Sequence, residues 1–173
     1  MIKKLLRYIG YNIIQFIKYL PFYWAMWLRN KCYKLVFKDM GEGSNICDGV
    51  TINYPHRVSI GQRVSIHPYC WISGFGGISI GNFVAISSGT KIISFNHIFP
   101  STKIPIKEQD YIKLPIKIED DVWIGANVII LGNISIGKGS VIGAGSVVTK
   151  NIPNYSIAVG NPCKVIKTRL KGH

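Results

Sequence analysis

The chain has 173 residues, of which 47% are hydrophobic and 17% are charged. A single domain with a buried core fits this length and composition, which exclude an intrinsically disordered protein. Lys and Arg outnumber Asp and Glu by 21 to 8, and the formal net charge of +13 favours anionic partners such as phosphates, anionic glycans or membrane surfaces. We find no RNA- or DNA-binding motif, so we expect no nucleic-acid partner.

Residues 1–38 form a basic, aromatic-rich segment with eight Lys or Arg and no acidic residue. The apolar residues have roughly helical spacing. The longest uncharged run in the segment is too short to span a bilayer, and the segment has no cleavage site of a signal peptide. Two interpretations stay open. The segment lies at the inner face of an anionic membrane as a peripheral contact, or it packs its apolar face on the body of the protein or a partner subunit.

The four cysteines have neither CxxC spacing nor a histidine pattern that would complete a zinc site; they are Cys32, Cys47, Cys70 and Cys163. We therefore expect reduced thiols, no metal and a cytoplasmic protein.

A six-residue period begins at Ile46 and is most regular from Ile116 to Val148. Its main column in that stretch is Ile118, Ile124, Ile130, Ile136, Ile142 and Val148. Neither a helix nor a plain strand returns to one face every six residues, so the period predicts short strands separated by turns and stacked coil on coil, a parallel β-solenoid. Two earlier slips of two residues each, at 54–57 and 74–77, mark loops that leave the coil.

The period lapses between Ile93 and Pro115 and stops after Lys150. A long insertion in a compact repeat is more often functional than idle, and an open solenoid end needs a cover. We therefore expect three parts: a helical segment at 1–45, the solenoid at 46–150 with an extended loop at 93–115, and a cap and tail at 151–173.

Three runs resemble the hexapeptide-repeat acyltransferases, within them the galactoside, maltose and serine O-acetyltransferases and the acetyltransferases of bacterial surface-polysaccharide clusters. The runs are Ile124-Gly-Ala-Asn-Val128, Ile136 to Lys150 and Val159-Gly-Asn-Pro162. The resemblance covers roughly Ile46 to Lys167. It implies an all-β fold, the left-handed parallel β-helix, a homotrimer, and acetyl-CoA bound between neighbouring subunits.

A base for the hydroxyl proton is the first requirement of acetyl transfer to a sugar, and histidine is the natural base near neutral pH. His97 opens the long insertion, and the resemblance implies the catalytic histidine at this place. We assign it as the general base of a direct attack on the thioester, with Asn96 orienting the ring or contacting the acceptor. His67 and Tyr69 are the candidate acceptor-pocket residues. A loop or surface histidine without function is the competing interpretation at each position.

The resemblance also implies the residues that bind coenzyme A. Trp123 corresponds to an aromatic beside the pantetheine arm; Gly125, Ala126 and Ala144 let backbone groups approach it, and Thr149, Lys150 and Lys167 lie toward the adenosine and phosphates. Because Ala126 replaces a serine that some relatives use, a backbone N–H at Gly125 or Ala126 is the candidate oxyanion donor.

The sequence favours an O-acetyltransferase of surface-polysaccharide synthesis over three alternatives. An N-acetyltransferase acting on an amino sugar would use the same base and donor. A non-catalytic β-helix module would need neither the histidine nor the phosphate-binding corner. A zinc-dependent β-helix carbonic anhydrase would need closely spaced imidazole ligands, whereas no two histidines here lie closer than His56 and His67.

Overall fold

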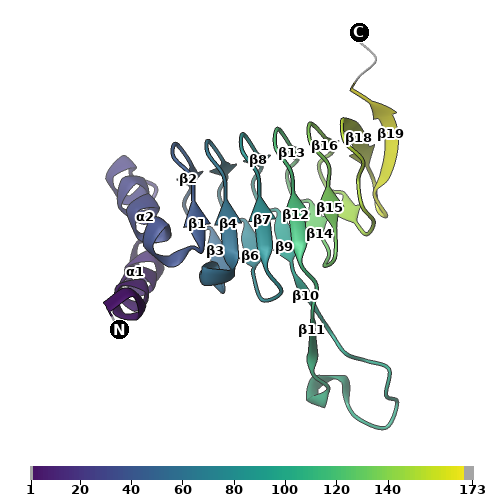
Figure 1. Ribbon diagram of the computed structural model, residues 1–173, viewed down its shortest axis with the longest axis horizontal. Coiled ribbons are helices and arrows are strands. Elements are labelled where there is room, and N and C mark those ends of the chain that lie inside the picture. The colour runs from purple at the N-terminus through teal and green to yellow at the C-terminus, as the bar shows by residue number, and fades with distance from the viewer. Residues whose placement is uncertain (1, 170–173) are drawn as a thin grey trace.

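Two helices begin the chain in the computed structural model, which describes residues 2–169 and the side chains of residues 5–169. They are α1 (Ile2–Ile17) and α2 (Tyr23–Val36), packed against each other at one end of the molecule (Figure 1). Neither described helix has the length and apolar character that crossing a bilayer requires. Lys3 and Lys4 of the predicted basic segment, and residues 170–173 of the predicted tail, lie outside the described side chains.

Arg29 of α2 fastens the end of α1. Its side chain is only 2% exposed, and Nη1 donates hydrogen bonds to the carbonyl oxygens of Ile17 at 3.0 Å and Leu20 at 2.7 Å. Carbonyls at the end of a helix have no partner within the helix, so the guanidinium satisfies groups that the turn would otherwise leave unpaired. Burial lowers the pKa of Arg29, while Asp48 opposes the shift.

Three parallel sheets follow and form the sides of a solenoid (Figure 1). Face A contains β1 (Asp39–Met40), β4 (Val58–Ile60), β7 (Ile78–Ile80), β12 (Ile116–Ile118) and β15 (Ser135–Ile136). Face B contains β2 (Asn45–Ile46), β5 (Ser65–Ile66), β8 (Ala85–Ile86), β13 (Trp123–Ile124) and β16 (Val141–Ile142), and is extended by β18 (Ser156–Val159) and β19 (Lys164–Thr168). Face C contains β3 (Thr51–Asn53), β6 (Trp71–Ser73), β9 (Lys91–Ile93), β14 (Ile129–Ile130) and β17 (Val147–Val148).

The residues that recur every six positions form the inward side of these strands. Every member of the main column from Ile118 to Val148 is at most 1% exposed, and equivalent residues pair directly between coils, as Ile124 does with Ile86 and Ile142. Each strand from β1 to β9 and from β12 to β17 is two or three residues long, because the chain turns a corner before it reaches another inward position. The predicted β-solenoid is confirmed.

The chain leaves the solenoid at two of the predicted places, both on the corner that joins face C to face A. The first slip forms the short 3₁₀ helix η1 (Pro55–Arg57). The long insertion forms an arm of two antiparallel strands, β10 (Phe95–His97) and β11 (Tyr111–Lys113), with a 3₁₀ helix η2 (Ile106–Glu108) in the loop between them. The arm projects from the side of the solenoid (Figure 1).

The C-terminal strands complete face B. β18 pairs in parallel with β16, and β19 turns back antiparallel to β18. Helix α2 contacts β1 and β2 at the opposite end. All four cysteines are free, and burial raises the pKa of the Cys70 thiol to about 11.

Candidate active site

His97 lies at the base of the arm, where β10 leaves the solenoid. It is paired with Tyr111 across the two strands, and the two rings are 4.3 Å apart between centroids. The imidazole is half-buried, with Nδ1 enclosed and without a hydrogen-bond partner among the described residues. Asn96 turns its amide oxygen back to accept the backbone N–H of His97 at 2.9 Å.

Trp123 lies on face B with its ring largely outside the core. Its side chain is 55% exposed, and indole Nε1 donates to the hydroxyl oxygen of Ser87 at 3.2 Å. Ser87 follows β8 on the preceding coil, so a hydrogen bond between coils sets the orientation of the ring. An exposed indole held in one orientation is suited to packing against an extended ligand or a neighbouring chain.

Gly125, Ala126 and Ala144 follow the strands of face B on two successive coils. The N–H of Gly125 donates to the carbonyl of Ile142 at 2.8 Å, and the carbonyl of Ala126 accepts from Gly145 at 2.8 Å. A Cβ on Gly125 would lie 2.6 Å from the backbone nitrogen of Ala144, so the stacking of the coils itself requires glycine. Of the two candidate oxyanion donors, the Gly125 N–H is therefore occupied, which leaves Ala126 as the candidate.

His67 and Tyr69 lie in the turn after β5, on the corner between faces B and C. Both side chains are exposed, and Tyr69 is 66% exposed. His67 is one coil before Ser87, because their backbone N–H groups bond to the successive carbonyls of Ile86 and Ile124. His67 therefore belongs to the same side of the solenoid as Trp123.

Thr149 and Lys150 follow β17 and occupy the corner between faces C and A, the corner from which the arm also departs. Lys167 lies on β19 opposite Ile157 of β18, at the C-terminal end of face B. All three side chains are exposed.

The predicted site residues thus form two groups on different sides of the solenoid. One group, on the corner between faces C and A, contains His97, Asn96, Thr149 and Lys150. The other, on face B and the corner that follows it, contains His67, Tyr69, Trp123, Gly125, Ala126, Ala144 and Lys167. One chain does not bring the histidine and the indole together, because the body of the solenoid lies between them.

Several aromatic residues beside His97 were not predicted from the sequence. Tyr111, Phe95, Phe75 and Tyr54 form a continuous cluster, with neighbouring ring centroids 5.2–6.2 Å apart. The signal was present in the sequence, since Tyr54 and Phe75 occupy the two slips and Phe95 lies in the insertion two residues before His97. Without the coil register, nothing showed that these positions stack on one corner. Among the described residues no group of three His, Cys, Asp or Glu side chains is arranged to hold a metal ion.

Comparison with known proteins places the chain in a family. Residues 115–150 match the family model described as bacterial transferase hexapeptide (six repeats). A protein of Staphylococcus aureus named as an acetyltransferase is 35% identical over an alignment of 149 residues that covers 80% of this chain and 70% of the relative. One of Mycobacterium tuberculosis is 37% identical over 132 residues, which are 76% of this chain and 44% of the relative, so the chain spans less than half the length of that protein.

Solved structures have the same fold over most or all of this chain. A hexapeptide-repeat acetyltransferase of Vibrio cholerae in complex with acetyl-CoA has a TM-score of 0.83 and 26% identity, covering 98% of this chain and 89% of that one. A maltose O-acetyltransferase of Clostridium difficile has a TM-score of 0.81 and 28% identity, covering 97% and 88%. AntD, an N-acyltransferase of Bacillus cereus solved with a dTDP-amino sugar and coenzyme A, has a TM-score of 0.67 and 25% identity, covering 82% and 88%.

The fold is therefore the left-handed parallel β-helix of hexapeptide-repeat transferases. The chain belongs to this family, whose named relatives are acetyltransferases.

Proposed function

We propose that this protein is an acetyl-CoA-dependent O-acetyltransferase that acts on a sugar hydroxyl. The position of His97 carries the proposal, since the ring is half-buried against Tyr111 at the base of the arm in a chain of this family. The acetyl-CoA complex of the Vibrio cholerae relative supports the donor, and the likeness to the maltose O-acetyltransferase supports a sugar hydroxyl as acceptor.

The chemistry needs one base and one attack. Because Nδ1 of His97 is enclosed, Nε2 is the nitrogen that takes the proton of the acceptor hydroxyl. The acceptor oxygen forms a bond to the thioester carbonyl carbon, the carbon–sulfur bond breaks, and the departing thiolate receives the proton. The N–H of Ala126 stabilises the oxyanion, and Asn96 holds the backbone at His97 through its side-chain oxygen.

The donor lies along face B in this proposal. Trp123 packs against the pantetheine arm, and Gly125, Ala126 and Ala144 allow it to approach the backbone. Lys167 of the same copy, together with Thr149 and Lys150 of the neighbouring copy, holds the adenosine and phosphate end. His67 and Tyr69 contact the acceptor from the same side.

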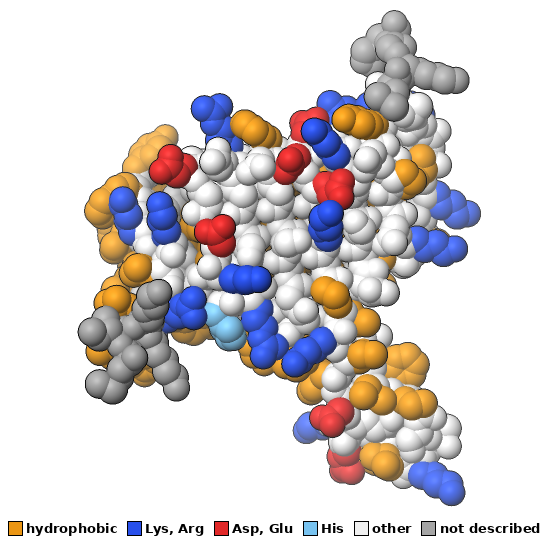
Figure 2. Space-filling model, in the orientation of Figure 1, with side chains coloured by type: hydrophobic (Ala, Val, Ile, Leu, Met, Phe, Trp, Pro, Cys, Tyr) orange, Lys and Arg blue, Asp and Glu red, His pale blue; other side chains and the backbone are white. Residues whose placement is uncertain are grey.

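A homotrimer joins the two groups of residues. His97 of one copy would face Trp123 and Ala126 of the next, which a single chain cannot achieve. One feature of the chain supports this arrangement: the arm exposes apolar side chains that gather along it (Figure 2). They include Phe99, 61% exposed, and Ile106, 55% exposed.

The direct test is the substitution His97→Asn, with transfer measured as released thiol across free sugars, nucleotide sugars and glycan fragments. Loss of a general base should lower kcat about 10²- to 10⁴-fold while the Kd for acetyl-CoA stays unchanged. Full activity of a folded His97→Asn protein would overturn the assignment of the base. Binding of acetyl-CoA without transfer to any acceptor would instead favour a non-catalytic module.

The specific alternative is transfer to an amine, which the likeness to AntD favours. Paired acceptors that differ only in an amino or hydroxyl group at one carbon distinguish the two reactions. Acetylation of the amino sugar alone would replace an O-acetyltransferase by an N-acetyltransferase.

We also propose that α1 and α2 rest on an anionic membrane surface, which would place the enzyme at the cytoplasmic side of surface-polysaccharide synthesis. Aromatic side chains on these helices are exposed, among them Phe16 at 88%, Tyr23 at 86% and Trp27 at 62%, beside Lys18 and Lys31. Co-sedimentation with vesicles containing phosphatidylglycerol tests this contact. Absence of binding, or equal binding of a Phe16→Ser/Trp27→Ser variant, would remove the membrane from the proposal.

A further inference from the structure

The corner that carries the aromatic cluster also contains cavities that are lined by residues other than the proposed catalytic residues. A cavity of about 240 Å³ is lined by Asn53, Tyr54, Trp71, Ser73, Phe75, Phe95 and Tyr111. Since Tyr111 also packs on His97, this cavity begins beside the proposed base. Aromatic walls of this kind suit the C–H face of a pyranose ring, which packs against them and leaves its hydroxyls free.

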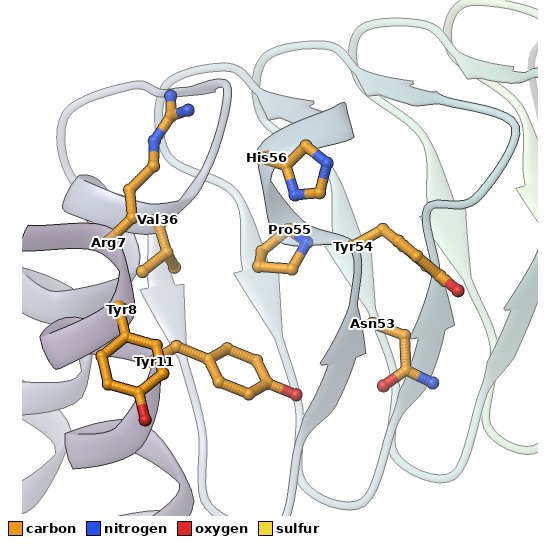
Figure 3. Close-up of a pocket in the computed structure, with 8 residues that line it drawn as sticks. All are labelled: Arg7, Tyr8, Tyr11, Val36, Asn53, Tyr54, Pro55 and His56. Carbon is orange, nitrogen blue, oxygen red and sulfur yellow. The ribbon is translucent and has the colours of Figure 1, made fainter. Parts of the chain in front are cut away.

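A second cavity of about 630 Å³ continues the first toward the N-terminus, because Asn53 and Tyr54 line both. It lies between α1 and the turn that precedes β4, and Figure 3 shows Tyr11 reaching under Pro55 while Arg7 and His56 stand on the same side of the opening. The remaining lining residues are Tyr8 and Val36. The two cavities together form a groove that runs from His97 to α1.

Positive charge is concentrated along this groove. A third cavity, about 340 Å³, shares His56 and Phe75 with the other two and is also lined by Lys38, Arg57 and Lys113. Figure 2 shows Lys and Arg side chains around a histidine on the edge of the solenoid between the helices and the arm. Among the residues that the structure describes, no Asp or Glu lines any of the three cavities.

The charges at this corner are not neutralised within the described residues. Arg57 donates to the carbonyl of Phe75 at 2.6 Å and lies over the rings of Tyr54 and Phe75, while Lys113 lies over Phe75. Arg7, Lys38, Arg57 and Lys113 form no ion pair in the part of the chain that the structure describes. Burial lowers the pKa of His56, and the charges of Arg57 and Arg7 lower it further. A cluster of cations without counter-charges, next to an aromatic cavity, is suited to a phosphorylated sugar.

We propose that this groove binds the acceptor and that the acceptor is a glycosyl diphosphate. The sugar stacks in the aromatic cavity beside His97, and the diphosphate lies near Arg7 and His56 with Lys38, Arg57 and Lys113 behind it. The groove is long enough to hold both a sugar and a diphosphate. Tyr54 and Phe95 follow face C strands that are two coils apart, which is a separation of about 10 Å at the usual spacing between strands. The α1 end of the groove receives the carrier, which is a nucleoside or a polyprenyl chain.

This inference rests on the proposed function, so its test separates acceptor binding from donor binding. The probe is inorganic pyrophosphate, titrated calorimetrically into protein saturated with coenzyme A so that the donor's phosphate site is filled. We expect binding to the wild type, weakened about tenfold or more by Arg7→Gln and unchanged by Lys34→Gln, which removes an exposed cation of α2 outside the three cavities. Both side chains are exposed, so neither change should impair folding.

Kinetics then identify the sugar end and the carrier. With a glycosyl diphosphate acceptor, Tyr54→Ala and Arg7→Gln should each raise the acceptor KM at least tenfold without changing the KM for acetyl-CoA. Turnover of a uridine-diphosphate sugar supports a nucleoside carrier. Turnover of a citronellyl-diphosphate sugar supports a polyprenyl carrier. The proposal is overturned if pyrophosphate fails to bind the coenzyme A-saturated protein, or if it binds Arg7→Gln as tightly as the wild type. Failure of acetyl-CoA itself to bind would refute the proposed function instead.

Discussion

At the scale of single residues, packing and chemistry compete for the same positions. Gly125 illustrates this competition. The family resemblance implies a glycine there to admit the pantetheine arm, yet the structure shows a requirement that exists without any ligand, since Ala144 of the next coil lies against it. A glycine in this repeat is therefore weak evidence for a binding site until its neighbours are known.

Substituting Gly125 by alanine should destabilise the solenoid. The new Cβ would meet the backbone nitrogen of Ala144 at 2.6 Å, and backbone in a stacked coil cannot move aside easily. We expect a loss of about 1–3 kcal/mol in the free energy of unfolding, visible as a lower Tm.

Gly10→Ala is the matched control. A Cβ there would contact Val36 at 3.4 Å in an ordinary way, inside α1, where alanine is favoured over glycine by about 1 kcal/mol. Equal Tm values for the two variants would refute the stacking argument.

Trp123 is the residue that should separate donor binding from chemistry. Trp123→Ala removes an exposed ring from face B without opening the core, so the protein should fold normally. If the ring packs on the pantetheine arm, the KM for acetyl-CoA should rise about tenfold, with the acceptor KM unchanged. Ser87→Ala should produce a smaller increase, because it removes only the hydrogen bond that orients the indole.

At the scale of elements, individual side chains hold the helices and the arm in place. The two β10–β11 strands hold His97 against Tyr111, and Arg29 of α2 holds the end of α1. In both cases a polar or aromatic side chain fixes a segment outside the repeat, and the proposed acceptor groove depends on both segments.

Replacing Arg29 by methionine tests how α1 is held. The change leaves two carbonyls, of Ile17 and Leu20, without their charged donor, and hydrogen bonds to charged groups are worth about 1.5–3 kcal/mol. We expect a stability loss of this size and faster amide hydrogen exchange in α1, with exchange in the solenoid strands unchanged. Exchange that stays slow in α1 would show that apolar packing alone fixes the helix.

At the scale of the whole molecule, the separation of the two groups of site residues is the main consequence of the fold. His97 projects from the corner between faces C and A, whereas Trp123 and Ala144 belong to face B and the corner after it. If these two groups form one site, that site needs two copies of the chain, and the proposed trimer would contain three such sites, each between neighbours.

Mixed trimers test this arrangement directly. His97→Ala and Ala144→Arg should each abolish transfer. The first removes the base, and the second obstructs the face B surface proposed to bind the donor. When equal amounts of the two variants reassemble at random, an intact His97 should face an intact donor-binding surface at about a quarter of the interfaces of a cyclic trimer. The released-thiol assay should then recover about that fraction of wild-type activity; no recovery despite mass-spectrometric detection of mixed trimers would mean that each chain carries its own site.

The sequence by itself determined the solenoid and the place of His97. Period-six aliphatic columns admit few other folds, because only short stacked strands return to one face on that schedule, and an interruption in the columns is visible as a lapse in the pattern. The departure of the arm followed from these two facts. The ends of the solenoid did not, because β1 joins face A from Asp39, before the predicted start at 46, and β18 extends face B beyond Lys150.

Only the tertiary structure showed that the interruptions of the period lie on the same corner of the solenoid. Tyr54, Phe75 and Phe95 are about 20 residues apart in the chain, and their register places them on one corner beside His97. The separation of His97 from Trp123 likewise depends on which corner each strand precedes. Turn geometry and coil stacking determine such neighbours, and no local pattern of side chains encodes them.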